Sequence, residues 1–252
     1  VVALEEGARA TVINRLKGTE EEGEVIVNDG ADMYVGAGGQ LDYLALHDLN
    51  IDSSLFNNST GRVERDAHLH HFTNELGGMF TKVRTDVHLN GTGADVRLDG
   101  LYFGYEDQHM DLRTVQYHKA QNANSRTFYK GAVKDEAHSI YQGLIAVDYG
   151  CDQTDAYLTN NNLILNDGAR ADSIPTLQIH TDDVKCSHGS TTGKVDQNQL
   201  FYLTSRGMPL AEAKLLLVQG FFEENIERAP QLLQEELRDR IAERMLAEQD
   251  ED

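Results

Sequence analysis

Cysteine, proline, tryptophan and basic residues are all scarce in this chain. Its 252 residues include two cysteines, three prolines and no tryptophan, and 42 Asp and Glu against 22 Lys and Arg give a formal net charge of -20. Two cysteines are too few for a disulfide framework, and they suit a reducing compartment such as the cytoplasm. The negative charge repels nucleic acids and anionic membrane surfaces, and no cluster of Lys and Arg offsets it. We therefore expect no nucleic-acid or membrane partner.

Long apolar runs and several catalytic motifs are absent as well. No stretch approaches the roughly 18 to 20 apolar residues of a membrane-spanning helix, and the first residues do not read as a signal peptide. The Gly-x4-Gly-Lys-Ser/Thr loop that cradles nucleotide phosphates is missing, and so is the Gly-x-Ser-x-Gly elbow of serine hydrolases. We expect a soluble, cytoplasmic protein that does not bind nucleotide through such a loop.

Most of the chain has the pattern of β-structure. From residue 1 to about residue 184, short alternating or β-branched runs such as residues 83–89 are separated by glycine and asparagine turns, and no stretch has a helical period. Pro175 is the single proline of this region, so nearly every backbone N–H can donate to a ladder. The pattern predicts an all-β body, and a sandwich, a barrel and a parallel β-helix all fit it.

The period changes to helical near residue 196. Asp196 is expected to cap a first helix that stops with Gly207 at C′, and Pro209 is expected at N1 of a second helix. A third helix should begin near Pro230, with an apolar stripe of Leu233, Leu237, Ile241 and Met245. We therefore expect a β core over residues 1–192 and a helical subdomain over residues 193–252, with a frayed acidic tail at 248–252.

Cys186 and His188 form a Cys-x-His pair where the β body meets the helices. In an extended strand residues i and i+2 point to the same side, so the thiol and the imidazole should face one point in space. Such donors suit a soft or borderline metal, or an iron–sulfur cluster. A Rieske centre is excluded, because no second cysteine follows Cys186. On its own, the pair equally fits a half-buried cysteine beside a hydrogen-bonded histidine. Cys151 has acidic neighbours, which raise the pKa of a thiol, and we expect it to be inert.

His68, His70 and Glu75 have the His-x-His-x4-Glu spacing of the first cupin metal motif. In a cupin these three side chains of a small barrel converge on one metal ion. The Pro-x-Gly turn and the further histidine of the second motif are missing here. A histidine-rich, half-exposed strand explains the same residues, and a cupin-like metalloenzyme remains an alternative.

The segment that contains the Cys-x-His pair also resembles a known family. Residues 183–196 read DVKCSHGSTTGKVD, residues 199–208 read QLFYLTSRGM, and upstream agreement includes DGLY at 99–102 and RTFYKG at 126–131. These residues closely resemble the SufB/SufD family, the scaffold subunits of the SUF iron–sulfur cluster assembly machine, over roughly residues 24–228. The resemblance implies a right-handed parallel β-helix with a C-terminal helical subdomain, and a scaffold without enzymatic activity of its own.

The resemblance also implies partners and a site. Family members pair through their β-helices, so a homodimer or a heterodimer with a SufB/SufD paralogue is expected, and the helical part docks SufC, an ABC-type ATPase. His188 matches the interface histidine that SufD-type subunits contribute to a transient iron–sulfur cluster, and Cys186 matches its neighbouring cysteine. SufB-type subunits carry a cysteine within the segment at 160–163 and a glutamate in place of Gly189. The chain is therefore SufD-like or a minimal archaeal-type subunit.

Two further expectations follow from the resemblance. The helical N-terminal region of longer members has no counterpart here, so the sequence is a minimal version or a fragment. A scaffold that only stabilises its partner and binds no cluster is also compatible with the sequence.

Overall fold

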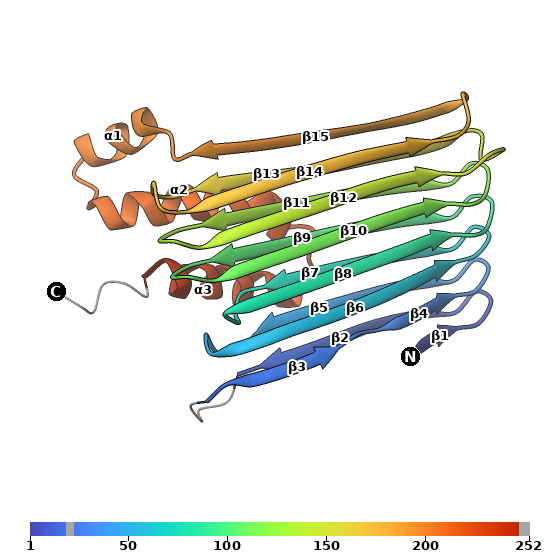
Figure 1. Cartoon of the computed structure of the whole chain (residues 1–252), viewed down its shortest axis with the longest axis horizontal. Coiled ribbons are helices and arrows are strands. Elements are labelled where there is room, and N and C mark those ends of the chain that lie inside the picture. The colour runs from blue at the N-terminus through green and yellow to red at the C-terminus, as the bar shows by residue number, and fades with distance from the viewer. Residues whose placement is uncertain (19–22, 247–252) are drawn as a thin grey trace.

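The computed structural model describes residues 1–18 and 23–246 and contains two facing sheets and three C-terminal helices (Figure 1). Sheet A contains β1 (Val2–Leu4), β3 (Val25–Asp29), β4 (Asp32–Val35), β6 (Ser53–Val63), β8 (Phe80–Leu89), β10 (His109–His118), β12 (His138–Val147) and β14 (Arg170–Ile179). Sheet B contains β2 (Arg9–Lys17), β5 (Gln40–Asp48), β7 (His68–Glu75), β9 (Asp95–Gly104), β11 (Asn124–Val133), β13 (Thr154–Ile164) and β15 (Val184–Lys194). Every pairing in both sheets is parallel.

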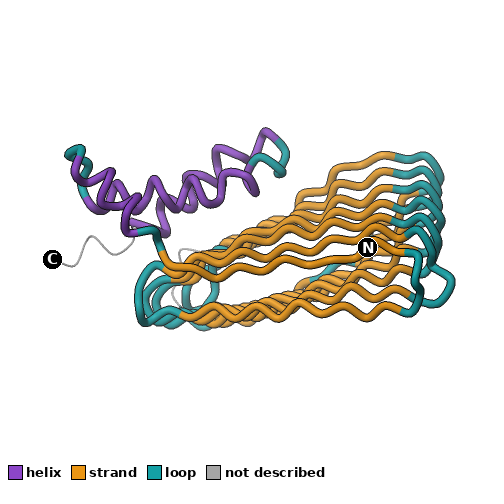
Figure 2. The backbone as a smooth tube through the Cα atoms, turned by 90° about the horizontal axis from the view of Figure 1, so that it is seen from above, coloured by secondary structure: helices purple, strands orange, loops and turns teal. Residues whose placement is uncertain are grey.

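Apart from β3 and β4, which both lie in sheet A and pair with β6, the chain alternates between the two sheets, so that each rung of the solenoid has one strand in each sheet (Figure 2). In sheet A, His109 lies in register with Phe80 below it and His138 above it, a spacing of 29 residues on each side. This arrangement confirms the predicted parallel β-helix. No repeat is visible in the sequence, because each rung position requires only a side chain of suitable size and polarity.

Residues with a left-handed backbone conformation recur at one corner of the solenoid, so successive rungs have turns of the same shape. Asp66, Asn122 and Gln153 have φ values of 55°, 57° and 59°. Their backbone N–H groups donate to carbonyls of the next rung, as from Asp66 to Thr92 at 3.0 Å. Asp and Asn tolerate this left-handed conformation better than most residues. This preference explains the turn residues that the sequence places at this corner.

The interior of the solenoid is largely apolar and contains close tyrosine–glycine contacts. A Cβ at Gly131 would lie 1.9 Å from the ring of Tyr102, and a Cβ at Gly100 would lie 2.3 Å from the ring of Tyr129. Both tyrosines are at most 1 % exposed. Glycine is therefore required beneath each ring, because any larger residue would overlap it.

The helices are α1 (Gln197–Ser205), α2 (Leu210–Ile226) and α3 (Gln231–Leu246). Asp196 caps α1 as predicted, its side chain accepting from the Asn198 N–H at 2.8 Å, and Gly207 follows the end of α1 with a φ of 90°. Pro209 lies at the N-cap of α2, one residue earlier than expected. No described helix is long and apolar enough to cross a membrane. The acidic tail expected at 248–252 lies outside the described residues.

Helices α2 and α3 pack on the outer face of sheet B and form a second core there. The predicted stripe of α3 is confirmed: Leu233, Leu237 and Ile241 are buried against this face. Asn225 of α2 donates to the Gly100 carbonyl at 2.5 Å, and Lys130 of β11 donates to the Phe221 carbonyl at 2.8 Å. The apolar stripe of α3 is therefore used within the chain.

Candidate functional site

Cys186 and His188 lie on β15, which forms one edge of sheet B. Within the described residues β15 pairs only with β13, where Cys186 is in register with Ala156 and His188 with Leu158. Ala156 and Leu158 are 1 % and 0 % exposed and belong to the interior core. Side chains in register in a parallel sheet point to the same face, so Cys186 and His188 both face the interior side. No described rung covers them, which leaves Cys186 half-buried and His188 exposed.

The surroundings of Cys186 favour its protonated form. Burial raises the pKa of the Cys186 thiol, a backbone hydrogen bond with Ala156 opposes this, and the Asp155 carboxylate adds to the rise. A metal ion that binds this sulfur must therefore displace a proton, which makes binding weaker at low pH.

One chain alone does not supply a complete set of metal ligands. Among residues 1–18 and 23–246, no three His, Cys, Asp or Glu side chains are arranged to hold a metal ion. Cys186 and His188 supply two donors, whereas an iron atom in an iron–sulfur cluster is typically held by thiolate or imidazole ligands in addition to the inorganic sulfides. A metal ion bound by this pair would need further donors from another molecule.

A buried polar network lies directly below β15, and the sequence-based expectations did not include it. Tyr102 donates to Asn162 Oδ1 at 2.5 Å, Asn162 donates to Asn160 Oδ1 at 2.8 Å, and Asn160 donates to the Tyr102 hydroxyl oxygen at 3.2 Å. Asn160 and Asn162 are in register with Ser190 and Thr192 of β15. Alternate asparagines within one strand are the signal that would have pointed to a polar interior here.

His68, His70 and Glu75 are not brought together. His68 and His70 lie on the outer face of β7, and His70 Nε2 is 3.1 Å from a carboxylate oxygen of Asp99. Glu75 is fully buried on the inner face, where its carboxylate lies 2.9 Å from His47 Nδ1. The odd spacing between the histidines and Glu75 puts them on opposite faces of the strand, and the solenoid is not a closed barrel. The structure therefore gives no support to the cupin-like alternative.

Cys151 is 3 % exposed in the interior core. Burial raises the pKa of its thiol, and the Asp148 carboxylate raises it further. This agrees with the expectation that Cys151 is not a reactive thiol.

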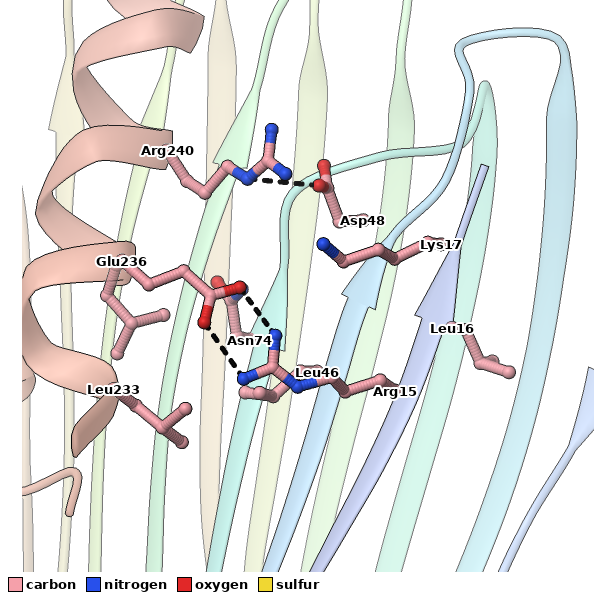
Figure 3. Close-up of a pocket in the computed structure, with 10 residues that line it drawn as sticks. Arg15, Leu16, Lys17, Leu46, Asp48, Asn74, Leu233, Glu236 and Arg240 are labelled. Atoms are coloured by element: carbon pink, nitrogen blue, oxygen red, sulfur yellow. Dashed lines mark hydrogen bonds and ion pairs between the residues drawn. The ribbon is translucent and has the colours of Figure 1, made fainter. Parts of the chain in front are cut away.

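A small pocket of about 20 Å³ lies under α3, at the far end of sheet B from β15 (Figure 3). Arg15 of β2 makes two hydrogen bonds to Glu236 of α3, at 2.6 and 2.8 Å. Arg240 lies 3.3 Å from an oxygen of Asp48, which also accepts from Arg244 at 2.6 Å. These ion pairs span the pocket and join α3 to the solenoid.

Comparison with known proteins identifies the family. Residues 1–221 match the model of the SufBD core domain of SUF-system FeS cluster assembly. An iron-sulfur cluster assembly SufBD family protein of Mycobacterium bovis is 35% identical over 235 residues, which are 90% of this chain and 58% of that protein. SufD of Escherichia coli is 33% identical over 231 residues, which are 89% of this chain and 53% of that protein. The chain thus spans about half the length of these curated relatives. It belongs to the SufBD family of iron–sulfur cluster assembly proteins.

Proposed function

We propose that this protein is a scaffold subunit on which SUF-type iron–sulfur clusters are assembled in the cytoplasm. The observation that carries the proposal is the placement of Cys186 and His188 on one face of an open edge strand. The cluster is cargo, held transiently by these two donors and by donors of a second subunit. Family membership supports the assembly role, and the two free thiols suit a reducing compartment.

The second subunit pairs through the last rung, formed by β14 and β15. Among the described strands, β14 and β15 each pair on one side only, and β14 also exposes Ile174 to 51% and Ile179 to 36%. An open solenoid end is a template for strand pairing and is usually capped. A second SufBD subunit, either a copy of this chain or a paralogue, would cap this end and bring its own donors to Cys186 and His188.

An ABC-type ATPase docks on α1 and on residues 216–221 of α2. In the described structure α1 buries none of its residues, and it exposes Phe201 to 73% and Tyr202 to 56%. Beside it, a groove of about 400 Å³ has Val195, Leu216, Leu217, Gly220 and Phe221 in its lining, together with the polar residues Lys194, Asp196 and Gln199. Exposed aromatic and leucine side chains around a groove are typical of protein-binding surfaces. The chain lacks a phosphate-binding loop, so ATP hydrolysis belongs to this partner.

Anaerobic reconstitution with iron and sulfide tests the assembly role. The wild-type protein should gain cluster absorbance with stoichiometric iron and sulfide, whereas Cys186→Ser and His188→Ala should each lose most of it. Cys151→Ser is the matched control and should keep the cluster, because its thiol lies in the apolar interior. Equal cluster content in wild type and the double variant would contradict the proposed site.

Pull-down with the cognate ATPase tests the docking surface. Phe201→Asp places a charge in the exposed α1 face and should weaken binding at least tenfold. Leu232→Asp is the control, because Leu232 is 69% exposed on α3, away from the groove. Loss of binding with the control and not with Phe201→Asp would move the docking surface to α3.

A further inference from the structure

We infer that the interior of the solenoid binds an ordered water molecule between Gln116 of β10 and Thr127 of β11. This internal site is separate from the assembly site and from the partner surfaces proposed for this protein. It follows from buried polar atoms for which the fold supplies no protein partner.

Gln116 and Thr127 both face the apolar interior. They are 0 % and 2 % exposed. Each is in register with two fully buried apolar residues of the neighbouring rungs, which are Val87 and Ile145 for Gln116 and Leu98 and Leu158 for Thr127. Among the residues that the structure describes, neither the side-chain nitrogen and oxygen of Gln116 nor Thr127 Oγ1 has a hydrogen-bond partner. Such groups lose their hydrogen bonds to solvent on burial, which costs free energy unless a new partner replaces them.

The polar groups beside this pair do have protein partners. Thr114 lies two residues from Gln116 on the same face of β10, and its Oγ1 lies 2.7 Å from the Tyr141 hydroxyl. His118 lies two residues away in the other direction, and its Nε2 lies 2.8 Å from Ser125 Oγ. Gln116 and Thr127 therefore differ from their neighbours, because the chain leaves their polar atoms to be satisfied by something else.

Gln116 and Thr127 lie opposite each other across the interior. A short turn at residues 119–123 joins β10 to β11, and His118 and Ser125 are the facing pair next to this turn. Gln116 and Thr127 lie two residues further from the turn on the same inner faces, so they form the next facing pair. No hydrogen bond joins their side chains directly. A small ligand between the two strands can therefore contact both residues at once.

The donors and acceptors at this position select water over an ion. Gln116 presents an amide donor and a carbonyl acceptor, Thr127 presents a hydroxyl that can act as either, and His118 Nδ1 also lacks a partner. Burial lowers the pKa of His118 to about 4, so its ring is neutral at pH 7 and does not attract an anion. An anion cannot donate to Gln116 Oε1, and a metal ion cannot accept from the Gln116 amide. Water does both, and a buried water typically makes about three hydrogen bonds.

A high-resolution crystal structure of the wild-type protein tests the site directly. We expect an electron-density peak within about 3.2 Å of both the Gln116 side chain and Thr127 Oγ1. The peak should be lost in Gln116→Met, whose side chain has a similar length but no amide. Gln178→Met is the matched control, because Gln178 is exposed on β14, and it should keep the peak. A direct hydrogen bond between Gln116 and Thr127, or an interior without the peak, would overturn the inference.

Thermal unfolding distinguishes a bridged pair from two unpaired groups. Thr127→Val keeps the shape of the side chain and removes its hydroxyl. If the hydroxyl binds water, its loss should lower the Tm by about 2–4 °C, the shift that one hydrogen bond gives in a chain of this size. If the hydroxyl has no partner, the same change removes a buried unpaired group and should raise the Tm.

The same substitution in a Gln116→Met background tests whether the two residues share one water. There Thr127→Val should no longer lower the Tm, because the water has already lost its site. A raised Tm for Thr127→Val in the wild-type background, or an equal loss in both backgrounds, would overturn the inference.

Discussion

A buried ion pair inside the solenoid should make its stability depend on one proton. His47 is 1 % exposed, and its Nδ1 lies 2.9 and 3.0 Å from the two carboxylate oxygens of Glu75, which is fully buried. Its Nε2 lies 3.7 Å from a carboxylate oxygen of Asp29. Burial alone would lower the pKa of His47, but the Glu75 and Asp29 carboxylates outweigh burial and raise the pKa to about 9.

The size and sign of the effect follow from this pKa. A raised histidine pKa stabilises the fold fully below the unfolded value of about 6.5, and this contribution is lost as the pH rises through about 9. At 1.36 kcal/mol for each pKa unit, the contribution is about 3 kcal/mol. We therefore expect the free energy of unfolding to fall by up to about 1.4 kcal/mol for each pH unit between about pH 6.5 and 9.

Two substitutions separate the ion pair from packing. His47→Gln leaves the Glu75 carboxylate buried without a cationic partner and should cost about 3–5 kcal/mol at pH 7. His47→Gln combined with Glu75→Gln replaces the ions by two amides, so it should be more stable than His47→Gln alone and should lack the alkaline loss. Urea unfolding followed by circular dichroism at pH 6, 7, 8 and 9 measures both effects. The same alkaline slope in the double variant, or a cost below about 1 kcal/mol for His47→Gln, would refute the reasoning.

Three further effects are expected. Gly131→Ala forces a methyl group into the Tyr102 ring and should lower the free energy of unfolding by about 1–3 kcal/mol, seen as a lower Tm. Gly150→Ala tests whether a glycine in a left-handed turn matters as much. Burial lowers the pKa of His71 to about 3, so stability should fall as the pH drops below about 6.5, and His71→Phe, which keeps the stacking on Tyr43, should reduce this acid loss. Because burial raises the pKa of the Cys186 thiol, its alkylation should be slow at pH 7 and faster at pH 9 and above. In the folded protein Cys151 should react more slowly still, because it is buried. Equal alkylation rates at pH 7 and 9 would contradict the last expectation.

Features that depend on a few neighbouring residues were predictable. The Asp196 cap, the end of α1 at Gly207 and the buried stripe of α3 each arise from hydrogen bonds or side-chain periodicity within a few residues. The β pattern predicted strands but not their arrangement, since apolar alternation is shared by sandwiches, barrels and solenoids. Only the resemblance singled out the solenoid.

Features that join distant residues were not predictable from local pattern. His47 and Glu75 are 28 residues apart, and they meet because one rung stacks on the next. The network of Tyr102 with Asn160 and Asn162 was missed for the same reason, because its members come from strands two rungs apart. Stacking requires only that each side chain fits the neighbouring rung, and it does not require a particular residue. The sequence therefore shows no repeat.

For the candidate site, the division is similar. The sequence by itself determined that Cys186 and His188 share one face, because side chains alternate along any extended strand. The same alternation already separated Glu75 from His68 and His70. Only the tertiary structure decided that β15 is an edge strand. Cys186 and His188 therefore lie beside the interior core, and no described rung covers them on the other side. Strand order depends on which rung is last in the stack, and this is a property of the whole fold rather than of any segment.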